Sequence, residues 1–90
     1  MQEGKAAALL VEELNRANRI YGPSFASPHE GYAVILEELD ELFDEIRKKQ
    51  PDKERLQEEA IQIGAMAIKF ITSLKDWPRL NPKPDRWVGR

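Results

Sequence analysis

The chain has 90 residues, no cysteine, and a net charge of −2 from 16 acidic and 14 basic residues. This length suffices for one domain and is too short for two, and the missing cysteine excludes a disulfide framework and favours a reducing compartment. No stretch approaches the roughly 18 apolar residues of a membrane span, and the first residues lack the basic and apolar run of a signal peptide. We therefore expect a cytoplasmic protein that binds neither a membrane nor a nucleic acid.

The first expected element is a helix over residues 3–21. Its apolar side chains recur at helical intervals of three and four residues: Leu10, Leu14, Ala17 and Tyr21. Gly22 and Pro23 then end the helix, because glycine accepts a left-handed backbone and proline cannot continue the hydrogen-bond ladder.

A complete start signal opens the second expected helix. Ser27, Pro28 and Glu30 supply a serine N-cap, a proline at the first helical position and a glutamate at the third, which is the pattern of a capping box. An apolar stripe, expected to face the core, then follows: Tyr32, Ile35, Leu36, Leu39, Leu42, Phe43 and Ile46. The basic residues 47–49 are expected to form the last turn, where the helix dipole favours cations.

The third expected helix runs from about residue 52 to about residue 75. Its second half, residues 60–74, carries apolar side chains in every direction, so this helix is either central or covered by another subunit. The last segment, residues 76–90, contains three prolines and no periodicity, which indicates an extended arm. Trp77 is expected to close the bundle, and the rest of the arm to pack over a neighbouring subunit.

The predicted fold is therefore all-α. A helical bundle of three main helices occupies residues 1–75, an extended Pro-rich C-terminal arm occupies residues 76–90, and oligomerisation as a homodimer or homotetramer completes the core.

Carboxylates are concentrated on the second helix, where residues 37–45 hold six of them and no base. Glu38, Glu41 and Glu45, at spacings of three and four, form an acidic row along the border of the apolar stripe. A solvated helix face is the simplest explanation of such a row. Like charges at these spacings nevertheless cost a few tenths of a kcal/mol per pair unless something neutralises them.

Glu59 on the third helix counts against the explanation of a plain solvated face. It shares one helix face with the apolar residues Ile63, Met66 and Phe70. A buried carboxylate is costly unless it finds a cation, and the basic candidates for a structural salt bridge are Arg16, Arg19 and Lys69. If the second and third helices pack antiparallel, Glu59 instead faces the acidic row. Several carboxylates around one cavity suit a hard divalent cation such as Mg²⁺.

These residues resemble the MazG-like superfamily of all-α nucleoside triphosphate pyrophosphohydrolases, in particular its small phage and mobile-element type. That family carries a Glu-Glu-x-x-Glu helix followed by a helix bearing Glu-x-x-Asp. The first half matches Glu37-Glu38-Leu39-Asp40-Glu41. The second half falls on Glu58-Glu59-Ala60-Ile61-Gln62, with Gln62 in place of the aspartate. The resemblance covers about residues 15–74.

The resemblance implies a Mg²⁺-dependent enzyme, with Mn²⁺ as an alternative, that cleaves a nucleoside or deoxynucleoside triphosphate to the monophosphate and pyrophosphate. It implies the metal ligands Glu38, Glu41, Glu59 and Gln62. Either Glu41 or Glu45 would accept the proton of the attacking water. The candidates for phosphate contacts are Lys48, Lys49, Arg55 and Lys69, and Trp87 is a candidate for stacking on the base.

The glutamine at position 62 leaves alternatives open. A glutamine offers one neutral oxygen to a cation but removes a full negative charge. Glu45, one turn beyond Glu41, is a candidate to supply the missing charge. Three alternatives to an active enzyme remain. The chain is a nucleotide-binding relative that has lost turnover, a helical interaction module whose acidic row receives a basic partner, or a structural oligomer. An inward carboxylate cluster favours the enzyme, whereas an outward cluster favours the interaction module.

Overall fold

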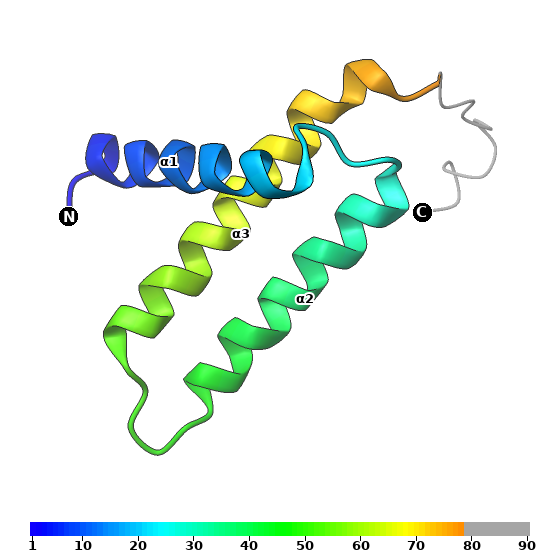
Figure 1. The fold of residues 1–90 in the computed structure, drawn as a ribbon. Coiled ribbons are helices and arrows are strands. Elements are labelled where there is room, and N and C mark those ends of the chain that lie inside the picture. The colour runs from blue at the N-terminus through cyan, green and yellow to red at the C-terminus, as the bar shows by residue number, and fades with distance from the viewer. Residues whose placement is uncertain (79–90) are drawn as a thin grey trace, which may run out of the picture.

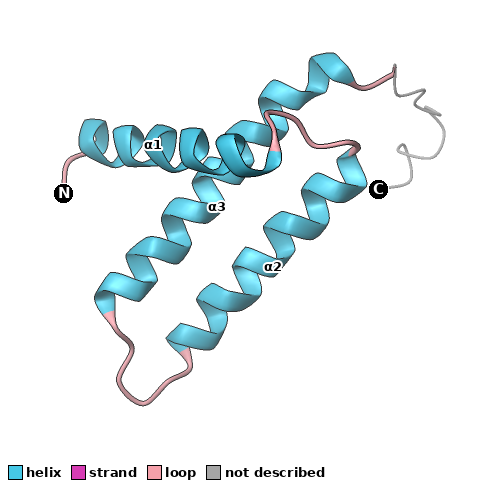
Figure 2. Cartoon of the chain, viewed as in Figure 1, coloured by secondary structure: helices cyan, strands magenta, loops and turns pink. Residues whose placement is uncertain are grey.

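A computed structural model describes residues 1–78, and helices are the only regular elements in that range. They are α1 (Glu3–Tyr21), α2 (Pro28–Ile46), α3 (Lys53–Ser73) and the short 3-10 helix η1 (Leu74–Asp76). Figure 1 shows α2 and α3 as an antiparallel hairpin with α1 crossing α3, and Figure 2 shows the loops that join them. The predicted all-α fold is confirmed for this part of the chain.

The central element is α3, because both α1 and α2 pack against it while α1 and α2 make no close contact with each other. Ala65 and Met66 of α3 are buried in the core. A Cβ atom added at Gly64 would lie 2.6 Å from Leu10 Cδ2, so the missing side chain lets α1 cross closely. Part of the apolar second half of α3 is thus covered within the chain, whereas Ile71 and Leu74 remain 65 % and 50 % exposed.

Helix α2 starts where the capping pattern predicts. Ser27 Oγ accepts a hydrogen bond of 3.1 Å from the backbone N–H of Glu30, and Glu30 Oε1 accepts one of 2.7 Å from the N–H of Ala26. These bonds satisfy donors that a helix N-terminus otherwise leaves free. The preceding helix, α1, ends at Gly22 with a φ of 89°, which is the left-handed region that glycine tolerates.

Helix α2 ends at Ile46, three residues earlier than predicted. Glu45 folds back over the following turn, where Oε1 accepts from Lys48 Nζ at 2.8 Å and Oε2 accepts from the N–H of Asp52 at 2.9 Å. Asp52 in turn caps α3 through a bond of 2.9 Å from the N–H of Glu54. The basic residues 47–49 therefore lie in the turn between the two helices, outside the helical turn that they were expected to form.

The loop between α1 and α2 is fastened to the C-terminal end of α3. The N–H of Phe25 donates to Ser73 Oγ at 3.0 Å, and the indole N–H of Trp77 donates to the Phe25 carbonyl at 2.8 Å. Trp77 is buried and packs edge-on against Phe70, with ring centroids 5.0 Å apart. The packed core thus extends past the boundary expected at residue 75. The remainder of the predicted arm, residues 79–90, lies outside the described residues.

The apolar stripe of α2 faces outward over much of its length, which corrects the expectation that it lies in the core. Five of its members are exposed: Tyr32, Leu36, Leu39, Phe43 and Ile46. Half-buried Ile35 and Leu42 face α3 together with Glu38 and Glu45, so the face turned toward α3 mixes carboxylates with apolar groups. Despite these apolar faces, no helix in residues 1–78 is long and apolar enough to cross a membrane.

Candidate metal centre

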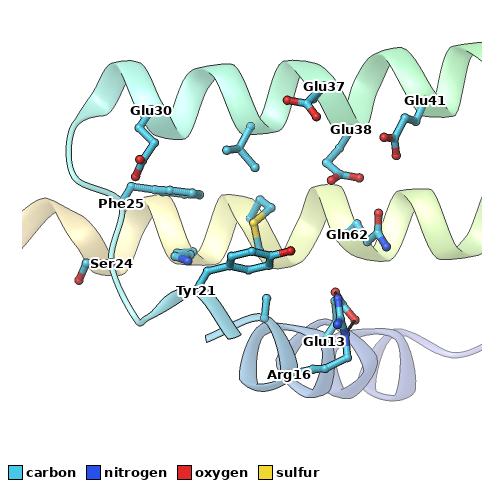
Figure 3. Close-up of a pocket in the computed structure, with 14 residues that line it drawn as sticks. Glu13, Arg16, Tyr21, Ser24, Phe25, Glu30, Glu37, Glu38, Glu41 and Gln62 are labelled. Atoms are coloured by element: carbon cyan, nitrogen blue, oxygen red, sulfur yellow. Dashed lines mark hydrogen bonds and ion pairs between the residues drawn. The ribbon is translucent and has the colours of Figure 1, made fainter. Parts of the chain in front are cut away.

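The two acidic half-motifs meet across the contact between α2 and α3. Glu38 and Glu41 of α2 and Glu59 of α3 each offer a carboxylate oxygen, and these oxygens all lie within 4.8 Å of one another. Figure 3 shows Glu38 and Glu41 reaching from α2 toward Gln62 of α3. The antiparallel pairing of α2 and α3 therefore brings the four predicted metal ligands to one place.

The three carboxylates differ in their exposure to solvent. Glu59 is only 2 % exposed, Glu38 is half-buried, and Glu41 is exposed at the edge of the cluster. Glu59 lies inside because it shares the groove-facing row of α3 with Gln62 and Met66, at offsets of three and seven residues. The cluster is therefore shielded from solvent at Glu59 on α3 and open to solvent at Glu41.

Gln62 links the carboxylates of both helices. Its amide lies 3.1 Å from Glu59 Oε1 and 2.5 Å from Glu38 Oε2. With its nitrogen toward them, the amide donates to both carboxylates; with its oxygen toward them, several oxygens face one another with no donor between. A cation or a protonated carboxyl group would favour the second orientation, so one side chain can serve the group with or without a metal.

Arg55 neutralises part of the cluster from one turn away. Its Nη2 donates to Glu59 Oε2 at 3.0 Å, and its Nη1 donates to Glu58 Oε2 at 3.2 Å. The salt bridge considered for Glu59 therefore forms with Arg55, and none of the three bases expected in that role makes it. Glu59 still faces α2, because its other oxygen, Oε1, lies beside Gln62. Arg55, predicted as a phosphate contact, sits at the carboxylate cluster.

Two carboxylates of the cluster, Glu38 and Glu59, hold their protons more tightly than isolated carboxylates do. Burial raises the pKa of Glu38 to about 7, and the charges of Glu41 and Glu59 push it the same way. Burial also raises the pKa of Glu59, as does Glu41, against the opposing effect of Arg55. The fold therefore gathers negative charge that its own bases neutralise only in part.

Two of the predicted site residues are engaged in the turn, outside the cluster. Glu45 is 5 % exposed, and both of its oxygens accept hydrogen bonds, from Lys48 and from the N–H of Asp52. The bond from Lys48 and then the one from Asp52 lower the pKa of Glu45, so its charge stabilises the turn. Lys48 is tied to Glu45, and Lys49 is exposed in the same turn. Trp87, the predicted stacking residue, lies outside the described residues.

A groove of about 600 Å³ extends from the cluster along α3, between α1 and α2. Its walls include Arg16 and Tyr21 of α1, which the sequence patterns did not indicate. Lys69, the remaining predicted substrate contact, lies in the groove at the end away from the cluster, near Phe25. The groove has the size of ligand pockets, which are about 300–1,000 Å³. The sequence carried one indication of this groove, on α3. Gln62, Met66 and Lys69 recur there at offsets of four and three residues and therefore share one helix face.

The raised pKa of Glu38 predicts how stability depends on pH. The metal-free folded protein holds the Glu38 proton up to about pH 7, whereas the unfolded chain releases it near the ordinary value of 4.5. The free energy of unfolding should therefore fall as the pH rises through this interval, since the folded state binds more protons there. Urea unfolding of the wild type and of Glu38→Gln at several pH values measures the effect. The variant should show a flatter profile, and an equal slope in both proteins would contradict the assignment to Glu38.

Comparison with known proteins adds no family to these observations. No protein-family model, no curated protein and no solved structure matches the chain. The arrangement of Glu38, Glu41, Glu59 and Gln62 beside the groove is therefore the observation on which a function rests.

Proposed function

We propose that this protein is a nucleotide pyrophosphohydrolase that depends on Mg²⁺ or Mn²⁺. It would cleave a nucleoside or deoxynucleoside triphosphate between the α and β phosphates and release the monophosphate and pyrophosphate. The observation that carries the proposal is the convergence of three carboxylates within 4.8 Å at one end of a groove of about 600 Å³. Oxygen ligands suit a hard divalent cation, and Mg²⁺ keeps water ligands that phosphate oxygens can replace.

In this proposal the residues of the cluster divide between two tasks, holding the cation and accepting a proton. Glu38, Glu59 and the carbonyl oxygen of Gln62 would hold the cation, which when bound neutralises phosphate charge and lowers the pKa of a coordinated water. Glu41 is exposed and pairs with no base among residues 1–78, so it is suited to accept the proton of the attacking water. The water oxygen would bond to the α phosphorus as the bond from that phosphorus to the leaving pyrophosphate breaks.

A specific observation also favours a second candidate, a nucleotide-binding relative without turnover. Arg55 and Gln62 together give Glu59 and Glu38 partners in the absence of a cation. A cluster satisfied in this way binds metal less tightly than one of bare carboxylates. The interaction module has less support, because Glu59 is buried and the acidic row does not form a continuous outward surface.

The first test is metal binding by the folded protein. Mn²⁺ should raise the melting temperature by mass action, because the cluster exists only in the folded state. Glu59→Gln should weaken Mn²⁺ binding by on the order of tenfold or more, since it removes the most buried of the three carboxylate charges. Asp40→Asn, which removes an acid on the same stretch of α2 outside the cluster, is the matched control and should bind as the wild type does. Equal binding by all three proteins would argue against this site.

The second test decides between the two candidates at Gln62. In an active enzyme, Gln62→Asp adds a negative charge beside the cation, so it should tighten Mn²⁺ binding and raise the rate of pyrophosphate release from a panel of nucleotides. In a binding-only relative, it should destabilise the metal-free protein with no gain in hydrolysis. Pyrophosphate release at saturating Mn²⁺ and urea unfolding without metal distinguish the outcomes. Failure of both proteins to bind Mn²⁺ at millimolar concentration would exclude the metal-dependent function.

We also propose that the chain forms a homodimer, and that the exposed apolar face of α2 is its interface. This replaces α3 as the expected surface, because α3 is already covered on two sides by α1 and α2. Leu39, Phe43 and Ile46 are 44 %, 55 % and 50 % exposed on consecutive turns of α2. A contiguous apolar face of this kind is typical of a protein interface, and two-fold symmetry is the simplest way to bury it.

The α2 interface predicts that removing its apolar groups dissociates the dimer. The double variant Leu39→Ser, Phe43→Ser should sediment as a folded monomer at micromolar concentration, whereas the wild type should sediment as a dimer. Val11→Ser is the matched control, because Val11 is 48 % exposed but lies on α1. It should leave the dimer intact. A wild-type protein that sediments as a stable monomer at this concentration would refute the interface.

A further inference from the structure

Lys69 is a buried cation without an anionic partner. The residue is 3 % exposed, yet its ammonium group donates no hydrogen bond and pairs with no carboxylate in residues 1–78. Its contact is the face of the Phe25 ring, with Nζ 4.8 Å from the ring centroid. Glu30 also lines this part of the groove, but it makes no ion pair with Lys69, and one of its oxygens accepts from the N–H of Ala26. The stem of Lys69 is buried while its ammonium group opens onto the groove, where solvent or a ligand supplies an acceptor.

The position of Lys69 separates it from the carboxylate cluster. It lies seven residues beyond Gln62, which is about 10 Å along the axis of α3. Its ammonium group faces Phe25, which is hydrogen-bonded to Ser73 and Trp77, still further along the chain. The ammonium group therefore points toward the end of the groove opposite the cluster. This direction does not suit a contact with phosphates held at Glu38 and Glu41.

The middle of the groove, between Lys69 and the cluster, is lined largely by apolar groups. Ala17, Val34 and Met66 line this part, and Figure 3 shows the Tyr21 ring lying across it. A flat, largely apolar ring fits such a lining, with its polar edge directed at Lys69. A nucleotide has this sequence of parts, because a sugar separates its phosphates from a planar base with hydrogen-bonding groups on its edge.

We propose that Lys69 reads the base, donating a hydrogen bond to an exocyclic carbonyl oxygen. The groove would then prefer uracil or thymine over cytosine, and guanine over adenine, because each favoured base has a carbonyl where its counterpart has an amino group. Lysine has donors only, so an amino group at that position opposes donor to donor and leaves the charge buried without an acceptor. Sites built around such a hydrogen bond reject the mismatched ligand strongly. This inference rests on the proposed nucleotide site and deepens it.

The test uses the α,β-imido analogues of dUTP, dCTP, dGTP and dATP, which report binding without hydrolysis. Calorimetry with Mg²⁺ should show that the wild type binds the dUTP analogue over the dCTP analogue, and the dGTP analogue over the dATP analogue. The expected preference is on the order of tenfold or more in each pair. Lys69→Met keeps the buried stem and removes the charge, so it should bind all four analogues alike. Lys53→Met, which removes an exposed lysine at the start of α3, should keep the preference.

Two further measurements separate the inference from the proposed function. Lys69→Met should keep the Mn²⁺ affinity of the wild type and should melt at about the same temperature without ligand, because it keeps the buried stem and removes a charge that pairs with no carboxylate in residues 1–78. A lower melting temperature together with unchanged base preference would make Lys69 a structural residue that acts through Phe25. Wild-type protein that binds Mn²⁺ but not the carbonyl bases preferentially would overturn the inference alone. Wild-type protein that binds no Mn²⁺ would overturn the proposed function and the inference with it.

Discussion

Carboxylates packed between α2 and α3 are the constraint on which the rest of this structure depends. The face that α2 turns toward α3 includes Glu38 and Glu45, although the same helix leaves Leu39 and Phe43 exposed. Burying a charge costs free energy unless a partner compensates, and the two carboxylates are compensated differently. Glu45 is fully satisfied by the turn that it closes, whereas Glu38 has only the amide of Gln62 and a pKa raised to about 7. Glu38 is therefore the carboxylate of this face that the fold leaves incompletely paired.

The crossing of α1 gives that carboxylate access to a ligand. Leu10 rests on α3 where Gly64 has no side chain, and α1 and α2 do not close over the space between them. The resulting groove has the carboxylate cluster at one end, and Lys69 and Glu30 line the other. The two ends of the groove therefore differ in the charged groups that they present. This polarity follows from one row of α3, where acidic, amide, apolar and basic side chains succeed one another.

The helices and the meeting of Glu38, Glu41 and Glu59 could be predicted because they depend on local spacing. Offsets of three and four residues fix a helix face, and an antiparallel hairpin then brings two such faces together. The orientation of α2 could not be predicted in the same way. Apolar periodicity indicates a face that is buried somewhere, and it does not say whether this chain or a partner covers Phe43 and Ile46. The second bond of Glu45, from the N–H of Asp52, depends on the geometry of a turn that no spacing rule reveals. The pairing of Arg55 with Glu59, in contrast, follows the i,i+4 spacing and could have been expected.

The charge balance of the cluster gives Gln62 a second role besides that of a weaker metal ligand. Glu38, Glu41 and Glu59 carry up to three negative charges, and the one guanidinium of Arg55 is shared between Glu59 and Glu58, which lies outside the cluster. A divalent cation would neutralise two of these charges. Without a cation, an aspartate at position 62 would add a further negative charge to this partly buried group and so destabilise the metal-free fold. The neutral amide avoids this cost, and it can turn either its nitrogen or its oxygen toward the carboxylates. Glutamine thus lowers the cost of the metal-free cluster, and it still offers one neutral oxygen to a cation.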